Sequence, residues 1–156
     1  MRYITADIIN QMNEPSGHDE RFDNLWNERM DSLQANFDSI KNQLPFSAVN
    51  FYENQVLLGY PAFCRSGNYA QDEFNFIIGK EPEKKIIFIS YDFYQKPEIE
   101  QYSGPGFSLS EPAVWLYDEF HLKKETYEHH IIFSDGMSYI IPFQSMYVRQ
   151  TSWFDE

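Results

Sequence analysis

The stretch "YEHHIIFSDGMSYIIPF", residues 127–143, decides the fold, because it has the pattern of two β-strands joined by a tight turn. Two apolar runs flank Asp135 and Gly136, and Asp-Gly in that setting is a strong short-range signal for a β-hairpin. With these two residues as the loop, Ser134 faces Met137, and the loop length sets the register of the whole pair.

The predicted register decides which side chains of the hairpin share a face. Successive residues of a strand point to opposite faces, so His129 and His130 cannot both bind one metal ion within a regular strand. The register places the following residues opposite each other: Ile132 and Tyr139, Ile131 and Ile140, and His130 and Ile141.

A second hairpin is predicted between residues 113–121 and 127–134, with residues 123–126 as a four-residue loop. In this register Leu122 faces Tyr127, and every earlier residue of the first strand gains a defined partner. The polar partners are Glu119 with His130, and His121 with Glu128.

These two glutamates and two histidines share one predicted face of the sheet. Imidazole and carboxylate groups bind Zn²⁺ and other divalent ions, and they also act as acid–base pairs. Alternatively they are exposed cross-strand pairs, each contributing about 0.2–1 kcal/mol to stability. The same face is expected to carry Trp115, Tyr117, Ile132, Tyr139 and Ile141. The opposite face, on which a helix could dock, is expected to carry Leu116, Phe120, Leu122, Ile131 and Phe133.

The N-terminal part of the chain is predicted to be helical. Residues 5–13 form a short helix, and residues 19–44 repeat apolar side chains every three or four positions, which indicates one long amphipathic helix. Ser16 and Asp19 resemble a capping box at its start, and Pro45 ends it. Such a helix buries one apolar stripe against a sheet or another helix.

From residue 46 onward the apolar residues alternate or form short runs, as in β-strands. Residues 94–112 contain three prolines and two glycines without periodicity, which predicts a long loop. The predicted strands are Gln55–Tyr60, Glu73–Ile78, Lys85–Tyr91, Ala113–His121, Tyr127–Ser134, Ser138–Phe143 and Met146–Arg149.

The order of these elements predicts an α+β fold. N-terminal helices, including the long amphipathic one, pack on a mostly antiparallel β-sheet of five to seven strands. Residues 1–156 are expected to form a single domain. Its helical part covers 1–44, its β-rich part covers 46–149, and a short tail covers 150–156.

Composition limits the classes of partner. The 156 residues include 24 acidic and 12 basic side chains, giving a formal net charge of −12, and 18% are aromatic. Nucleic acid is not an expected partner, because its phosphates would be repelled by such a field. The charge favours a protein partner with a basic surface, and it also favours solubility.

The single cysteine, Cys64, excludes an intramolecular disulfide and a thiolate metal cluster. Arg65 beside it could activate a nucleophilic thiol, although a lone cysteine is more often packed and inert. The start "MRYITADIINQMNE" lacks the apolar core of a signal peptide, and no run approaches the roughly 20 apolar residues of a membrane span. A cytoplasmic protein without a membrane contact is therefore expected.

Several stretches together resemble a known group of proteins. The start "MRYIT", a long helix ending in "LP", then "WLYDEF" and "HHIIFSDGMSYIIPF", are similar to small acidic bacterial proteins grouped as a domain of unknown function. The chain also resembles immunity proteins, which neutralise secreted toxins. The resemblance implies a bacterial cytosolic setting and binding rather than catalysis, and it supplies no catalytic residues.

The sequence favours a non-enzymatic protein-binding module with an acidic, aromatic-rich surface. Such a module would need no cofactor, and it would act as an immunity protein or an inhibitor does, by binding its partner. One alternative is a metal-dependent or acid–base enzyme that uses Glu119, His121, Glu128 and His130. Another is a small-ligand-binding protein with its site under the 94–112 loop. The sequence does not determine the oligomeric state. The aromatic residues expected at the binding surface are Trp115, Tyr117, Tyr139, Tyr102 and Phe107.

Overall fold

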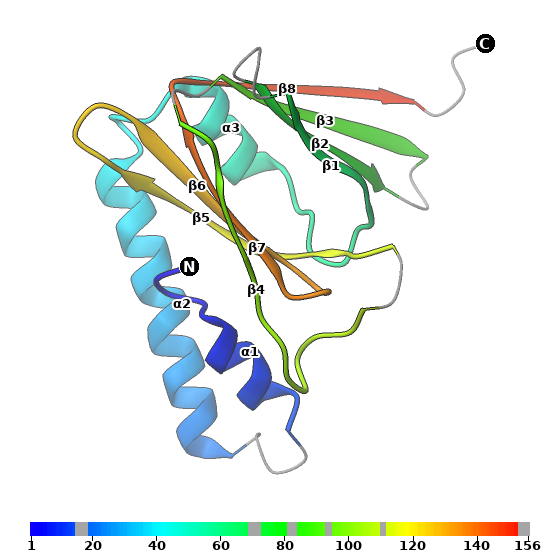
Figure 1. Cartoon of the computed structure of the whole chain (residues 1–156). Helices are drawn as coiled ribbons and strands as arrows, with labels where there is room; N and C mark the ends of the chain where they lie inside the picture. The colour runs from blue at the N-terminus through cyan, green and yellow to red at the C-terminus, as the bar shows by residue number, and fades with distance from the viewer. Residues whose placement is uncertain (15–18, 69–72, 81–83, 93–94, 110–111, 153–156) are drawn as a thin grey trace.

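The structure is a computed structural model that describes residues 1–14, 19–68, 73–80, 84–92, 95–109 and 112–152 (Figure 1). Two antiparallel four-stranded sheets, with strand orders β1-β2-β3-β8 and β4-β7-β6-β5, replace the single sheet of five to seven strands that the sequence predicted. The α+β class with antiparallel pairing is confirmed.

The helices are α1 (Ala6–Met12), α2 (Glu20–Ile40) and α3 (Phe46–Asn54). The strands are β1 (Ala62–Asn68), β2 (Glu73–Lys80), β3 (Lys85–Asp92), β4 (Glu98–Gln101), β5 (Trp115–Leu122), β6 (Tyr127–Phe133), β7 (Met137–Phe143) and β8 (Ser145–Ser152).

The two predicted helices are present, and a third was missed. Asp19 caps α2, since its side chain accepts a hydrogen bond from the Phe22 backbone N–H at 2.8 Å. Ser16, the other half of the predicted capping box, lies outside the described residues. The long helix ends at Ile40, and Pro45 is the N-cap of α3 rather than only a stop. None of the described helices is both long and apolar enough to span a membrane.

The strand predictions were wrong in two places. Residues 55–60 follow α3 as an irregular segment, and β1 lies further along the chain, so the β-rich part begins at Ala62 rather than at residue 46. Within the predicted 94–112 loop, β4 pairs with β7. All four residues of β4, EIEQ, are exposed, and one of them is apolar. The sequence therefore shows no apolar alternation there that would mark a strand. The β8 strand continues to Ser152, and the rest of the predicted tail lies outside the described residues.

The core lies where the inner faces of the two sheets meet. The ring of Phe76 on β2 lies 5.6 Å from that of Phe133 and 5.5 Å from that of Tyr139, both on the other sheet. Helix α3 adds Phe51, whose ring lies 6.0 Å from the Trp115 ring. Burial of this aromatic cluster stabilises the fold by about 25 cal/mol per Å² of apolar area removed from water.

Helices α1 and α2 lie on the far side of the β4-β7-β6-β5 sheet, away from the other sheet (Figure 1). A second apolar cluster there joins Ile4, Ile9, Leu33 and Ile132. Helix α2 also runs beside β5, a sheet edge, where the Asn36 amide donates a hydrogen bond to a β5 backbone carbonyl at 3.0 Å. The N-terminal elements therefore cover one face and one edge of this sheet.

The β6–β7 turn has one residue more than predicted. Ser134, Asp135 and Gly136 separate the strands, and Ile132 pairs with Ser138 instead of Tyr139. Within this turn Gly136 alone has a positive φ, +85°. A two-residue type I′ loop requires a positive φ at both central positions. A three-residue loop with glycine in the left-handed conformation is the other common hairpin solution.

Two local irregularities exchange side chains between the faces of this sheet. The longer turn moves Tyr139 and Ile141 to the core face, opposite to the prediction. A register shift between Trp115 and Tyr117 moves Trp115 into the core and Leu116 into the second apolar cluster. A one-residue change of register inverts the face of a side chain because the side-chain period in a strand is two.

Candidate functional site

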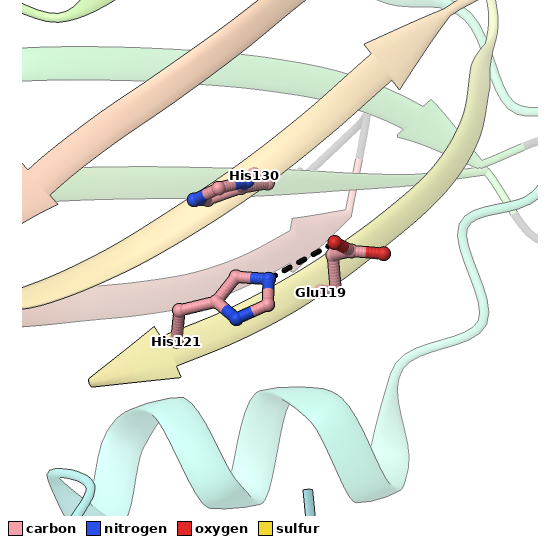
Figure 2. A group of neighbouring side chains, drawn as sticks. All are labelled: Glu119, His121 and His130. Carbon is pink, nitrogen blue, oxygen red and sulfur yellow. Dashed lines mark hydrogen bonds and ion pairs between the residues drawn. The ribbon is translucent and has the colours of Figure 1, made fainter. Parts of the chain in front are cut away.

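The polar cluster predicted on strands β5 and β6 is assembled as expected. Glu119 pairs with His130 and His121 with Glu128 in the β5–β6 register, because the four-residue loop was predicted correctly. Glu119, His121 and His130 each place one potential ligand atom within 4.8 Å of the others (Figure 2). Glu128 lies beside this group, where it contacts His130 and also pairs with Lys123 at 3.9 Å. We call Glu119, His121 and His130 the Glu–His cluster.

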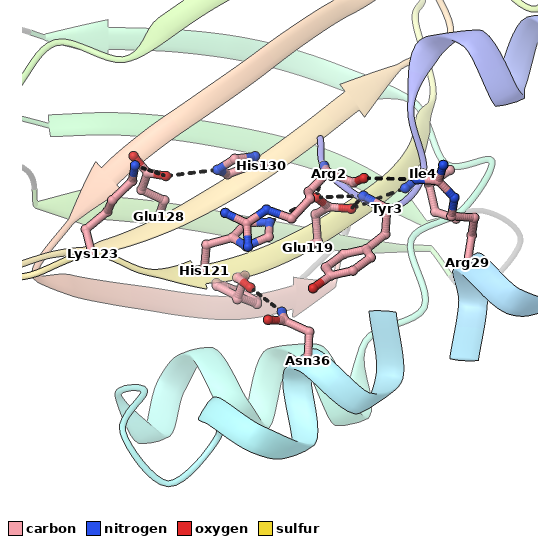
Figure 3. Close-up of polar contacts among 11 residues, drawn as sticks. Arg2, Tyr3, Ile4, Arg29, Asn36, Glu119, His121, Lys123, Glu128 and His130 are labelled. Carbon is pink, nitrogen blue, oxygen red and sulfur yellow. Dashed lines mark hydrogen bonds and ion pairs between the residues drawn. The ribbon is translucent and has the colours of Figure 1, made fainter. Parts of the chain in front are cut away.

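Glu119 is completely buried and holds the N-terminal segment in place (Figure 3). Its carboxylate accepts hydrogen bonds from the backbone N–H groups of Arg2, Tyr3 and Ile4. Burial raises the pKa of Glu119, but the hydrogen bonds from His121 and from the Arg2 and Tyr3 backbone outweigh it, and the net pKa is lowered. The carboxylate is therefore ionised at neutral pH.

The two histidines of the cluster face each other, with ring centroids 4.4 Å apart. His121 Nε2 lies 2.9 Å from a Glu119 oxygen, and His130 Nε2 lies 3.0 Å from a Glu128 oxygen. Burial, followed by the charge of neighbouring His121, lowers the pKa of His130 to about 3, so this imidazole is neutral. Its Nδ1 is buried and has no hydrogen-bond partner among the described residues.

His129 points to the opposite face, as the alternation predicted, and lies in the core. The Tyr91 hydroxyl is 2.6 Å from His129 Nδ1, and an Asp118 oxygen is 2.7 Å from His129 Nε2. Burial, followed by the charge of Asp118, raises the pKa of Tyr91 well above its ordinary value, which keeps the hydroxyl protonated. This chain joins β3 of one sheet to β5 and β6 of the other, and both histidine nitrogens are satisfied.

The aromatic residues predicted to form a binding surface do not lie together. Trp115 and Tyr139 are only 2% and 5% exposed, so neither can contact a partner in this conformation. Tyr117 packs edge-on against Trp26 on α2. Tyr102 and Phe107 line a cavity of ≈ 400 Å³ beside Asp135, in the region predicted to cover a small ligand.

Arg65, the neighbour of Cys64 in the sequence, is held by an acidic residue. The guanidinium of Arg65 makes a two-pronged ion pair with Asp135, at 3.1 and 2.7 Å, and also stacks over the Phe133 ring. The Cys64 sulfur instead lies 3.1 Å from the Ser66 hydroxyl.

The outer face of the β1-β2-β3-β8 sheet was not predicted as a site from the sequence. Helix α3 contacts β8 from the core side, and α1 and α2 lie against the other sheet, so no described helix covers this face. Phe63 and Tyr147 are 56% and 59% exposed. Tyr147 pairs with Ser90, and the Phe63 ring lies against Gly79 at the other end of this face. Together with half-buried apolar residues on β2 and β3 they form a set that we call the open face: Phe63, Ile77, Ile86, Phe88 and Tyr147.

Polar groups border the open face. Arg149 lies over the Phe88 ring, 4.9 Å from its centroid, and Ser90 donates a hydrogen bond to Asn75. At one end Glu73 on β2 is directly opposite Asp92 on β3, a pairing of like charges that destabilises a sheet unless a cation approaches. The sequence carried one signal of this face: "FNFIIG" and "KIIFISYD" place apolar residues on both sides of the strand.

Comparison with known proteins assigns the chain to no family, since neither a family model nor a curated protein matches it.

Proposed function

We propose that this protein is a non-enzymatic binding module whose open face docks a protein with a basic surface. The observation that carries the proposal is the open face itself, where Phe63 and Tyr147 are exposed and the other apolar side chains are half-buried on a well-paired sheet. A contiguous exposed apolar patch with a polar border is typical of a protein–protein interface.

The chemistry of the partner follows from charge. The chain carries a net charge of −12, and Glu73 and Asp92 set two carboxylates side by side at the end of the open face. A lysine or arginine placed between them would relieve their repulsion, while apolar groups of the same partner covered Phe63, Phe88 and Tyr147. The long-range field of an acidic protein also accelerates encounter with a basic one.

An inhibitor- or immunity-like role fits this surface. Such a protein acts by covering a partner, so it needs an exposed complementary patch and no catalytic groups. The proposed patch differs from the one predicted from the sequence, because Trp115 and Tyr139 are buried, and the two exposed aromatic residues of the open face, Phe63 and Tyr147, lie on β1 and β8.

The test is a binding measurement on single-residue variants of the full chain. A partner captured by the wild-type protein is purified and titrated against wild type, Phe63→Ser and Tyr147→Ser. We expect each substitution to raise Kd at least tenfold, because aromatic residues at the centre of an interface carry much of its binding energy. Raising the salt concentration should slow association. At 0.15 M ionic strength the interaction between exposed charges is already largely screened beyond about 8 Å, and more salt shortens this distance.

Phe46→Ser is the matched control, since Phe46 is the most exposed aromatic residue of α3 and lies outside the open face. It should leave Kd unchanged. Unaltered binding by the two open-face variants would contradict the proposal, as would a stable homodimer that covers the open face with a second copy of the chain.

A further inference from the structure

We propose that Glu119, His121 and His130 form a three-ligand site for Zn²⁺, with Glu128 as the carboxylate that orients His130. This inference is independent of the proposed protein binding, because the Glu–His cluster and the open face belong to different sheets. The three residues come from adjacent strands, two from alternate positions of β5 and one from the position opposite on β6 (Figure 2).

The separations within the cluster suit a single small ion. All three ligand atoms lie within 4.8 Å of one another, and Zn²⁺ ligands at bond lengths of about 2.0–2.2 Å lie closer than that to each other. Small side-chain rotations would therefore close the site. Because the backbone of paired antiparallel strands already brings the ligands together, little conformational entropy is lost on binding.

His130 has the protonation state that a ligand needs. Its Nε2 is hydrogen-bonded to Glu128 and so carries the proton, which leaves a free lone pair on the buried, unpartnered Nδ1. A buried acceptor without a partner is unfavourable, and a metal ion would satisfy it. A carboxylate that holds the second nitrogen of a metal-binding histidine is a common supporting feature of zinc sites.

Glu119 and His121 supply the other two ligands. The carboxylate carries a negative charge, and it has a lone pair directed at His121 Nε2, 2.9 Å away. Zn²⁺ would take the place of the proton between these two atoms, and that proton would move to Nδ1 of His121. The remaining lone pairs of the carboxylate would keep the N-terminal hydrogen bonds, since an ionised carboxylate accepts about four.

The donor set selects the class of metal. Two imidazoles and one carboxylate are typical of Zn²⁺, whereas Mg²⁺ and Ca²⁺ prefer sites made of oxygen ligands only. Three protein ligands leave a fourth position. On the solvent side Glu128, which is hydrogen-bonded to His130, lines a groove of ≈ 930 Å³ together with Glu98, Lys123 and Thr126.

The experiment measures Zn²⁺ binding by the full-length, metal-free chain in competition with a coloured chelator. We expect one ion per chain for wild type, an affinity at least 100-fold lower for His130→Phe and His121→Ala, and a 10- to 100-fold reduction for Glu128→Gln. The matched control, Glu125→Gln, alters an exposed carboxylate in the neighbouring loop and should bind as wild type does.

His130→Phe also separates metal binding from a purely structural role. The substitution removes the unpartnered nitrogen, and Glu128 keeps its contact with Lys123. In EDTA the midpoint temperature of thermal unfolding of the variant should therefore equal or exceed that of wild type. Added Zn²⁺ should raise the midpoint of wild type only, and it should shift the ¹⁵N signal of His130 Nδ1. Equal zinc affinity in wild type and His130→Phe, or an unchanged His130 signal, would overturn the proposal.

Discussion

Two sheet faces of this protein invert the usual relation between polarity and exposure. The face of the β4-β7-β6-β5 sheet that lies beneath the N-terminal segment is buried and yet carries Glu119, His121 and His130. The open face of the other sheet is exposed and yet carries Phe63 and Tyr147. Each face departs from the rule that polar groups lie outside and apolar groups inside.

The difference shows how each departure is stabilised. On the covered face, backbone N–H groups and neighbouring side chains satisfy the buried carboxylate, so its burial costs little net free energy. On the open face Arg149 lies over the Phe88 ring, while Phe63 and Tyr147 stay more than half exposed. The buried carboxylate is thus satisfied from within the chain, whereas the exposed side chains of the open face are available for another molecule to cover.

The largest expected effect comes from Glu119→Gln on the covered face. The amide would direct N–H donors at backbone N–H groups of the N-terminal segment, leaving buried donors unpaired. We expect a loss of about 3 kcal/mol in the free energy of unfolding, measured by urea denaturation. Glu125→Gln, an exposed carboxylate on the adjacent loop, should change stability by less than about 0.5 kcal/mol. A Glu119→Gln protein as stable as wild type would show that the N-terminal segment is not held by this residue.

The second effect is a pH dependence of the covered face in the presence of EDTA. His130 has a folded-state pKa of about 3, below its unfolded value of about 6.5, so the unfolded chain binds more protons between these values. Stability is therefore lost as pH falls below 6.5, by roughly 1.5 kcal/mol between pH 6.5 and 5 for this one group. Urea denaturation of His130→Phe should lack this contribution. Equal slopes for the two proteins above pH 5 would contradict a buried, neutral His130.

The smallest expected effect on stability lies on the open face. Tyr147→Ser removes a side chain that is 59% exposed, so the free energy of unfolding should change by no more than about 0.5 kcal/mol. Circular dichroism during thermal unfolding measures this change. A loss above about 2 kcal/mol would show that Tyr147 supports the fold and would remove the contrast between the two faces.

Hairpin β5–β6 was predictable because its loop length set the register, and with it the meeting of Glu119 with His130. Hairpin β6–β7 was predicted one residue out of register. Asp-Gly is compatible with loops of different length, and the contacts that select the three-residue loop come from distant segments. Asp135 is held by Arg65, and a side chain at Gly136 would lie 2.0 Å from the Tyr102 carbonyl oxygen.

Local alternation and periodicity determined the α+β class, the long helix α2, most strands and the separation of His129 from His130 onto opposite faces. These properties depend on neighbours within a few residues, which the sequence contains. Tertiary structure alone decided the division into two sheets, the burial of Trp115 and Tyr139, and the burial of Glu119 beneath the N-terminus. Those outcomes depend on which distant segment covers each face, and alternation is the same whether a face is covered or left open.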